Sequence, residues 1–195
     1  MFDNLIRSAV LGFAVGDALG VPVEFKTREY LKTNPVNDMI GYGSHNQPPG
    51  TWSDDTSMLL CTMESLAQGY DLQNIADSFV KWFSEGYWTA RGNVFDIGNT
   101  TLEAIKKLMS GVSPKESGRD DENSNGNGSL MRILPLAFTL IDKPIDVQFT
   151  IIREVSAITH AHTRSVLACL YYVRIAQSII AGKTKFKAYE EATYL

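Results

Sequence analysis

The chain has 195 residues, of which 44% are apolar and 21% are charged, as is ordinary for a soluble globular protein. Its 18 basic and 22 acidic residues give a formal net charge of −4, and its lysines and arginines do not cluster as they would to follow a phosphate backbone. We therefore expect no nucleic-acid partner. A chain of this length can bury a core, and we expect one domain over residues 1–195.

Neither secretion nor a membrane is indicated by the apolar segments. The run 9–15 is short and interrupted by Gly12, which does not fit a secretory signal. The most apolar stretch, 166–181, is too short to cross a bilayer of roughly 30 Å and predicts a buried core helix. Cys61 and Cys169 lie in apolar helical patterns without a spacing motif, so we expect reduced thiols in a cytoplasmic protein.

The first element is an amphipathic helix, because apolar residues recur at helical spacing over 2–15. Gly12, Gly16 and Gly20 follow at intervals of four. If the helix continues, they form a bare face that another backbone could approach; if it breaks, they supply a flexible turn. The proline two residues after Gly20 predicts that the helix ends there. Glu24 comes next, in an apolar segment where a lone glutamate is more often exposed than catalytic.

A segment with two adjacent carboxylates follows the irregular, proline- and glycine-rich loop 31–50. Ser53 is a favoured N-cap, and Asp54 and Asp55 in the first turn would complement the positive end of a helix dipole. The same hydroxyl and carboxylates are also suitable ligands for a hard cation. Capping is the simpler interpretation, and the metal interpretation requires partners elsewhere in the chain.

Three helices come next in the chain. The first stops at Gly69, a residue suited to the position just past a helix end. Asp71 is a favourable N-cap for the second helix, which ends near Gly86. The third helix begins around Leu102 and is closed by Gly111.

Two polar loops flank the third helix. The loop 87–101 combines aromatic residues with Asp96 and Asn99, so it can both stack and hydrogen-bond. The loop 115–128 ends in Asn-Ser-Asn-Gly-Asn-Gly, and a helical pattern resumes at Ser129. We interpret it as a glycine-rich loop entering a helix N-terminus, where backbone amides can face an anion. A plain flexible loop remains an equal alternative.

The last part of the chain is also helical. The helical spacing over 148–158 leads to His160 and His162, which would point in different directions on a helix and so do not form a helical chelate pair. The apolar helix 166–181 follows, and 183–195 has the pattern of another helix beginning. Neither sustained strand alternation nor an internal repeat is present. The predicted fold is therefore all-α.

Five segments, in this order, resemble the ADP-ribosylglycohydrolase family over residues 1 to about 182. Each motif alone is weak, but the ordered set is specific. The resemblance implies a compact, orthogonal bundle of many helices. The segments are Gly12 to Gly20 with Pro22 and Glu24, Gly50 to Thr56, Phe95 to Thr101, Gly126 to Arg132, and Thr159 to His162.

The resemblance also implies a chemistry, namely metal-dependent hydrolysis of the bond between C1″ of ADP-ribose and an acceptor. The substrate would be an ADP-ribosylated protein or a small ADP-ribose adduct, and the cofactor two Mg²⁺ ions, or Mn²⁺. Motif by motif, Ser53, Asp54 and Asp55 correspond to metal ligands, and Glu24 acts with the two aspartates in catalysis. The residues that correspond to substrate-binding positions are Asp96, Asn99, Gly126, Asn127, Gly128, Ser129, Leu130 and His160.

One motif of the family has no counterpart in this sequence. Family members carry a Gly-Asp-Thr-Asp-Thr type segment that supplies the remaining metal ligands, whereas no aspartate follows Asp146 here. We therefore expect an incomplete two-metal site. The chain would be a truncated product, would share the site with another chain, or would have lost hydrolysis. A non-catalytic ADP-ribose binder or structural relative is the alternative function, and phosphate-ester cleavage is a third.

Overall fold

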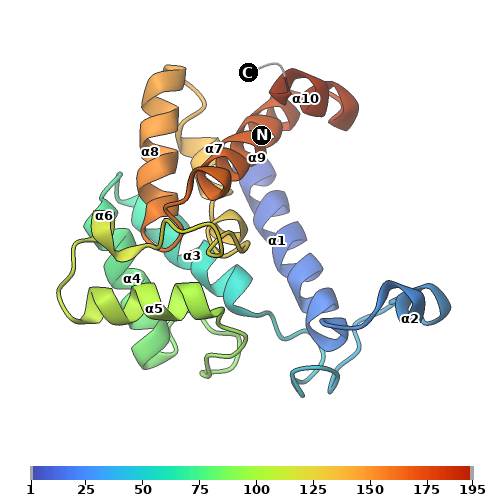
Figure 1. The fold of residues 1–195 in the computed structure, drawn as a ribbon. Helices are drawn as coiled ribbons and strands as arrows, with labels where there is room; N and C mark the ends of the chain where they lie inside the picture. The colour runs from blue at the N-terminus through green and yellow to red at the C-terminus, as the bar shows by residue number, and fades with distance from the viewer. Residues whose placement is uncertain (1, 194–195) are drawn as a thin grey trace.

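The computed structural model describes residues 2–193, which fold into ten α-helices and two 3₁₀ turns. The only β pairing within these residues is an isolated bridge between Arg119 and His160, so the all-α prediction is confirmed (Figure 1). The elements are α1 (Phe2–Gly20), η1 (Val21–Val23), α2 (Arg28–Thr33), α3 (Asp54–Ala67), α4 (Leu72–Glu85), α5 (Asn99–Met109), α6 (Pro114–Ser117), η2 (Leu130–Arg132), α7 (Pro135–Thr139), α8 (Ile145–Ala157), α9 (Thr163–Ile180) and α10 (Lys185–Ala192).

Helix α3 lies at the centre of the fold and packs against α1, α4, α7 and η2 (Figure 1). Helix α9 packs against α7, α8, α10 and η2, so the two long helices share the η2 segment as a neighbour. Buried apolar side chains from α3, α4, α7, α8 and α9 form one cluster, in which Met58, Phe79 and Trp82 are among the largest. The N-terminus of α3, where the predicted metal ligands lie, is thus fixed by the core.

The predicted helix ends around α4 are confirmed. The Asp71 side chain accepts hydrogen bonds from the backbone N–H groups of Gln73 and Asn74, at 2.9 and 3.2 Å. Gly86 closes the helix in the left-handed conformation, with φ of 70°, and donates its N–H to the carbonyl of Trp82. Both signals are local, which is why they are readable from the sequence.

Two short helices overlap segments predicted to be loops, at 31–50 and 115–128. Helix α2 begins after Thr27, whose side chain accepts a hydrogen bond from the backbone of Tyr30. Helix α6 begins after Ser113 with Pro114 in its first turn. These helices have 6 and 4 residues, too few for an apolar period to show.

Helix α9 packs in the core along one face only, so the prediction of a buried core helix holds for that face and not for the other. Val166, Cys169 and Val173 face the core, whereas Leu167 and Ile179 are 39% and 49% exposed. Both cysteines of the chain are free and buried, as expected for thiols that pack as small core residues. The cytoplasmic setting inferred from them stays a prediction.

The N-terminal helix is longer than its apolar period suggested, and the glycines at positions 12, 16 and 20 lie within it. Residues Asp3–Val23 are long and apolar enough to cross a membrane, by length and composition alone, with 17% of the best window buried. However, Ala9, Val10 and Phe13 pack against the core. This helix also supplies one boundary of the cavity described next.

Candidate active site

A cavity of about 890 Å³ lies where α1, the N-termini of α3 and α5 and the loop before η2 meet. Every predicted site residue lines it except Ser129 and Leu130. Gly12, Gly16 and Gly20 of α1 also line the cavity; a Cβ at any of them would meet nothing within 4 Å. The predicted residues in the lining are Glu24, Ser53, Asp54, Asp55, Asp96, Asn99, Gly126, Asn127, Gly128 and His160.

The N-terminus of α3 is capped by two side chains. The hydroxyl oxygen of Ser53 accepts a hydrogen bond from the N–H of Asp55, at 3.2 Å, so the predicted cap is confirmed. The carboxylate of Asp17 accepts from the N–H of Ser53 at 3.0 Å, and from the N–H and hydroxyl of Thr56 at 3.1 and 2.6 Å. Asp17 therefore joins α1 to α3 at the edge of the cavity.

Sequence reasoning gave Asp17 no role. It is the one charged residue of the Gly12 to Gly20 motif, and that was the available signal. Its partner Ser53 lies 36 positions away, so neither residue's local pattern shows the contact.

Five carboxylates line the cavity. Apart from Asp17, which caps α3, they are Glu24, Asp54, Asp55 and Asp96, and we call these four the carboxylate cluster. Burial, with the nearby charges of Asp55, Asp96 and Asp17, raises the pKa of Asp54 to about 9. Burial, then Asp17 and Glu24, raises the pKa of Asp55 to about 6. Burial and a hydrogen bond with Glu24 raise the pKa of Asp96 to about 7. These three carboxyl groups therefore bind protons more tightly than ordinary aspartates, because burial and the neighbouring carboxylates disfavour their negative charge.

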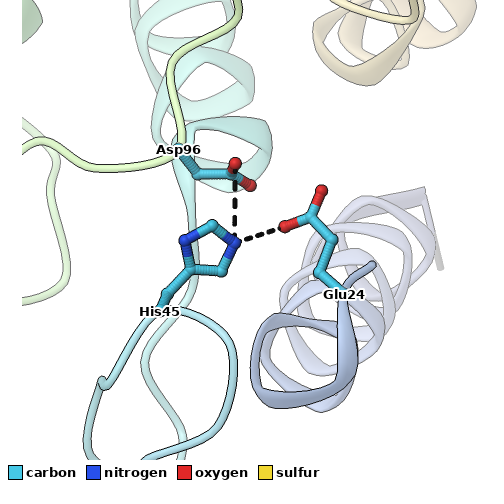
Figure 2. Close-up of side chains that lie close together, drawn as sticks. All are labelled: Glu24, His45 and Asp96. Atoms are coloured by element: carbon cyan, nitrogen blue, oxygen red, sulfur yellow. Dashed lines mark hydrogen bonds and ion pairs between the residues drawn. The ribbon is translucent and has the colours of Figure 1, made fainter. Parts of the chain in front are cut away.

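A residue that the sequence did not indicate stands between two members of this cluster. The Nε2 atom of His45 lies 2.6 Å from Oε2 of Glu24 and 3.5 Å from Oδ1 of Asp96 (Figure 2). One ligand atom of each of these three residues lies within 4.8 Å of the others, close enough to hold a cation together. His45 belongs to the loop predicted to be irregular, where no periodicity marks a functional side chain.

Two sets of residues in or beside the cavity have donors suited to a cation. Ser53, Asp54 and Asp55 offer oxygens only, which Mg²⁺ prefers. The Ser53 hydroxyl oxygen uses one lone pair for the helix cap and keeps the other available. Glu24 and Asp96 with His45 include an imidazole nitrogen, which suits transition metals better. The raised pKa values and the oxygen donors of the first set fit a magnesium or manganese ion.

The other part of the lining, which we call the glycine cluster, consists of Gly126, Asn127, Gly128 and His160. The segment 126–128 is irregular, as predicted, but the prediction that a long helix begins directly after it is wrong. The three-residue turn η2 begins there instead, so no helix of useful length starts at this loop. The helix N-termini that reach the cavity are those of α3 and α5. Any anion bound here would be held by backbone amides and side chains of the loop itself.

The environment of His160 sets its protonation. Its Nδ1 atom lies 2.8 Å from the hydroxyl of Thr159, which accepts a hydrogen bond from the guanidinium of Arg132. The Thr159 hydroxyl can donate to Nδ1 or accept from it, and the atom of the ring that faces Gly126 is Nε2. Burial and the nearby positive charge of Arg132 lower the pKa of His160 to about 4. His160 thus presents a neutral imidazole at the cavity.

Ser129 and Leu130 are the two predicted substrate-binding residues that lie outside the cavity lining, and their part in substrate binding stays a prediction. The side chain of Ser129 is buried and its hydroxyl lies 3.4 Å from the sulfur of Cys169. Leu130 packs against the core cluster. The turn at η2 directs both side chains inward, away from the glycine cluster.

The comparisons with known proteins all point to one family. The sequence profile described as ADP-ribosylglycohydrolase matches residues 2–194. The chain is 34% identical to the ADP-ribosylarginine hydrolase Tri1 of Serratia proteamaculans, covering 94% of this chain and 49% of that protein. It is 34% identical to the ADP-ribosyl-[dinitrogen reductase] glycohydrolase of Rhodospirillum rubrum, covering 96% and 62%.

A solved structure is also similar. A chain of an ADP-ribosylglycohydrolase-related protein complex superimposes with a TM-score of 0.68 at 31% identity, covering 89% of this chain and 55% of that one. The chain described here thus spans about half to two thirds of the length of these relatives.

Proposed function

The chain belongs to the ADP-ribosylglycohydrolase family, and from that premise we propose that it binds ADP-ribose adducts in its cavity and hydrolyses the bond at C1″ of the ribose. The substrate is an ADP-ribosylated protein side chain or a small ADP-ribose adduct. The observation that carries the proposal is the meeting of the carboxylate cluster and the glycine cluster in one cavity. The ribose hydroxyls suit a cation held by carboxylates, and the diphosphate suits the N–H donors of the glycine cluster.

The cation in this proposal is Mg²⁺ or Mn²⁺, held by Ser53, Asp54 and Asp55. When bound, it would supply positive charge that orients ribose hydroxyls and water near C1″. Its fit is supported by the raised pKa values of Asp54 and Asp55, because an added divalent charge would favour their ionised forms.

The other roles are assigned to residues of the chain. Glu24 acts as the general base or as the group that stabilises positive charge developing on the ribose, as carboxylates do in glycoside hydrolysis. Asp96 and Asn99 lie on the ribose and leaving-group side. The amides of the glycine cluster and the imidazole of neutral His160 bind the diphosphate and its ribose, since N–H donors suit phosphate oxygens.

Turnover assays test this function. The chain is incubated with Mg²⁺ and either an ADP-ribosyl-arginine peptide or O-acetyl-ADP-ribose, and released ADP-ribose is quantified by chromatography. We expect release that requires the metal and is lost in Asp54→Asn. Failure to release ADP-ribose from either substrate, by a sample that is folded and binds Mn²⁺, would contradict the proposal.

A second candidate is ADP-ribose binding without turnover. It is favoured by one observation: the glycine cluster and the support of His160 are complete within this chain, which spans only part of its relatives. Calorimetric titration with ADP-ribose separates the two functions when it is run beside the turnover assay. Binding without release supports the second candidate, and metal-dependent release eliminates it.

A further inference from the structure

The loop 41–47 is docked on the backbone that carries Glu24. The N–H of Ser44 donates to the carbonyl of Pro22 at 3.0 Å, and the hydroxyl of Ser44 donates to the carbonyl of Glu24. Gly43 lies so close that a Cβ atom there would overlap the carbonyl of Pro22. The contact is therefore made by the backbone and hydroxyl of Ser44 and by a residue without a side chain, so it fixes the loop closely against the Glu24 turn.

The same loop is closed on itself and presents one side chain at its tip. The N–H of Tyr42 donates to the carbonyl of Gln47 at 2.7 Å, and the N–H of Asn46 to the carbonyl of Gly43 at 3.1 Å. Tyr42 and Asn46 both adopt left-handed backbone conformations, with φ of 58° and 50°. His45 lies between them and points toward Glu24 (Figure 2).

The imidazole of His45 is confined on several sides. Its ring centre lies 5.8 Å from that of Phe25 and 5.4 Å from that of Phe95. Its Nε2 atom contacts the carboxylates of Glu24 and Asp96, at 2.6 and 3.5 Å. His45 does not line the cavity, whereas both carboxylates do. The histidine therefore lies behind the carboxylates, where it touches them and not a bound substrate.

We propose that His45 is a positioning residue: it holds the carboxylate of Glu24 beside that of Asp96 and directed into the cavity, with loop 41–47 as its support. The inference rests on the proposed function, in which Glu24 acts near C1″. Two carboxylates repel each other, and a donor between them stabilises the close arrangement. Without the donor, Glu24 would turn away from Asp96, and a displacement of about 1 Å costs roughly 100-fold in rate.

Kinetics of three variants test this role. His45→Leu should lower kcat by about 10- to 100-fold with KM nearly unchanged, because His45 does not line the cavity. His45→Gln should recover most of that loss, since its amide can donate to the same oxygen. His162→Asn, which changes another histidine and preserves the α9 cap, should leave kcat unchanged. An unchanged kcat in His45→Leu, or no recovery in His45→Gln, overturns the proposal.

A measurement without turnover separates this inference from the proposed function. The chain has 3 histidines, so ¹⁵N-histidine spectra resolve them individually. Glu24→Gln should change the ¹⁵N shift of His45 Nε2 and leave His160 and His162 unchanged. If the unsubstituted chain turns over neither substrate, the proposed function fails, and these spectra alone then test the contact between His45 and Glu24. A His45 signal that is insensitive to Glu24→Gln then overturns the positioning role.

Discussion

The carboxylate cluster and the glycine cluster share one cavity but satisfy their polar groups in opposite ways. The first gathers side chains of one sign, and their repulsion and burial raise the pKa values of Asp54, Asp55 and Asp96. The second presents uncharged groups, and the charge that supports it, Arg132, is fully buried behind them with three hydrogen bonds. A bound cation would therefore stabilise the carboxylate cluster, whereas the glycine cluster needs no added ion.

The two clusters also respond to pH with opposite sign. A carboxyl group with a raised pKa in the fold, such as Asp54, binds a proton more tightly than in the unfolded chain, so its contribution to stability falls as pH rises from about 4 to about 9. His160 has a lowered pKa, so the unfolded chain takes up its proton first, and stability falls as pH drops from about 6.5 to about 4.

Removing Arg132 should give the largest loss of stability. Its guanidinium donates to the carbonyls of Gly128 and Val155 and to the Thr159 hydroxyl, and it lies 4.6 Å from the ring centre of Phe79. Arg132→Met leaves these buried acceptors unpaired, at about 1–3 kcal/mol each, so we expect a loss of roughly 3 kcal/mol or more in urea unfolding. A loss below about 1 kcal/mol would show that the glycine cluster does not depend on this residue.

The matched control for this variant is Arg164→Met. Arg164 pairs with Glu122 where both side chains are mostly exposed, at 67% and 71%. We expect a change within about 1 kcal/mol there, as for other surface ion pairs.

Substitution of His160 should remove part of the acid sensitivity. In the unsubstituted chain this residue should cost up to about 3 kcal/mol between pH 6.5 and pH 4, as its proton uptake in the unfolded state takes effect. His160→Gln should flatten that part of a plot of unfolding free energy against pH, and His162→Asn should not. Equal slopes in all three proteins would contradict the neutral, buried state of His160.

Gly128→Ala should cost about 1–3 kcal/mol by overpacking. A Cβ atom there would lie 2.6 Å from Cε1 of His160 and 2.7 Å from the hydroxyl of Thr101. The control Gly16→Ala adds its methyl group to open space within α1, where alanine is the better helix former, and should be neutral or stabilising. Thermal unfolding distinguishes them, and equal melting temperatures would show that the glycine cluster has room to relax.

Asp54→Asn should stabilise the metal-free chain near pH 7.5, because it removes an acid that must take up a proton on folding. Its diagnostic effect is on the response to metal. Mn²⁺ at about 100 times its Kd should stabilise the parent by roughly 2.7 kcal/mol and the variant much less. Asp77→Asn, on the exposed surface of α4, should keep the full response. The metal assignment is wrong if both variants respond equally.

Local signals account for what the sequence predicted well. Asp71 and Gly86 mark the ends of α4 because each acts within one turn of its own position. The resemblance carried by the ordered motifs assigned Glu24, Asp54 and Gly128 to one site, and all three line the cavity. In contrast, His45 and Glu24 are 21 residues apart in the sequence, and Asp17 and Ser53 are 36 apart. Their contacts therefore became visible only in the folded structure.

The link between Asp17 and the start of α3 has a consequence for charge balance. A helix N-terminus carries about half a positive charge, which nearby carboxylates usually neutralise. Here Asp17 and Ser53 already bond the amides of Ser53, Asp55 and Thr56. The half-charge of α3 is thus largely compensated by Asp17 from α1, so it does little to stabilise negative charge on Asp54 and Asp55. Without a metal their raised pKa values mean that protons balance this charge, and a divalent cation would take the place of those protons.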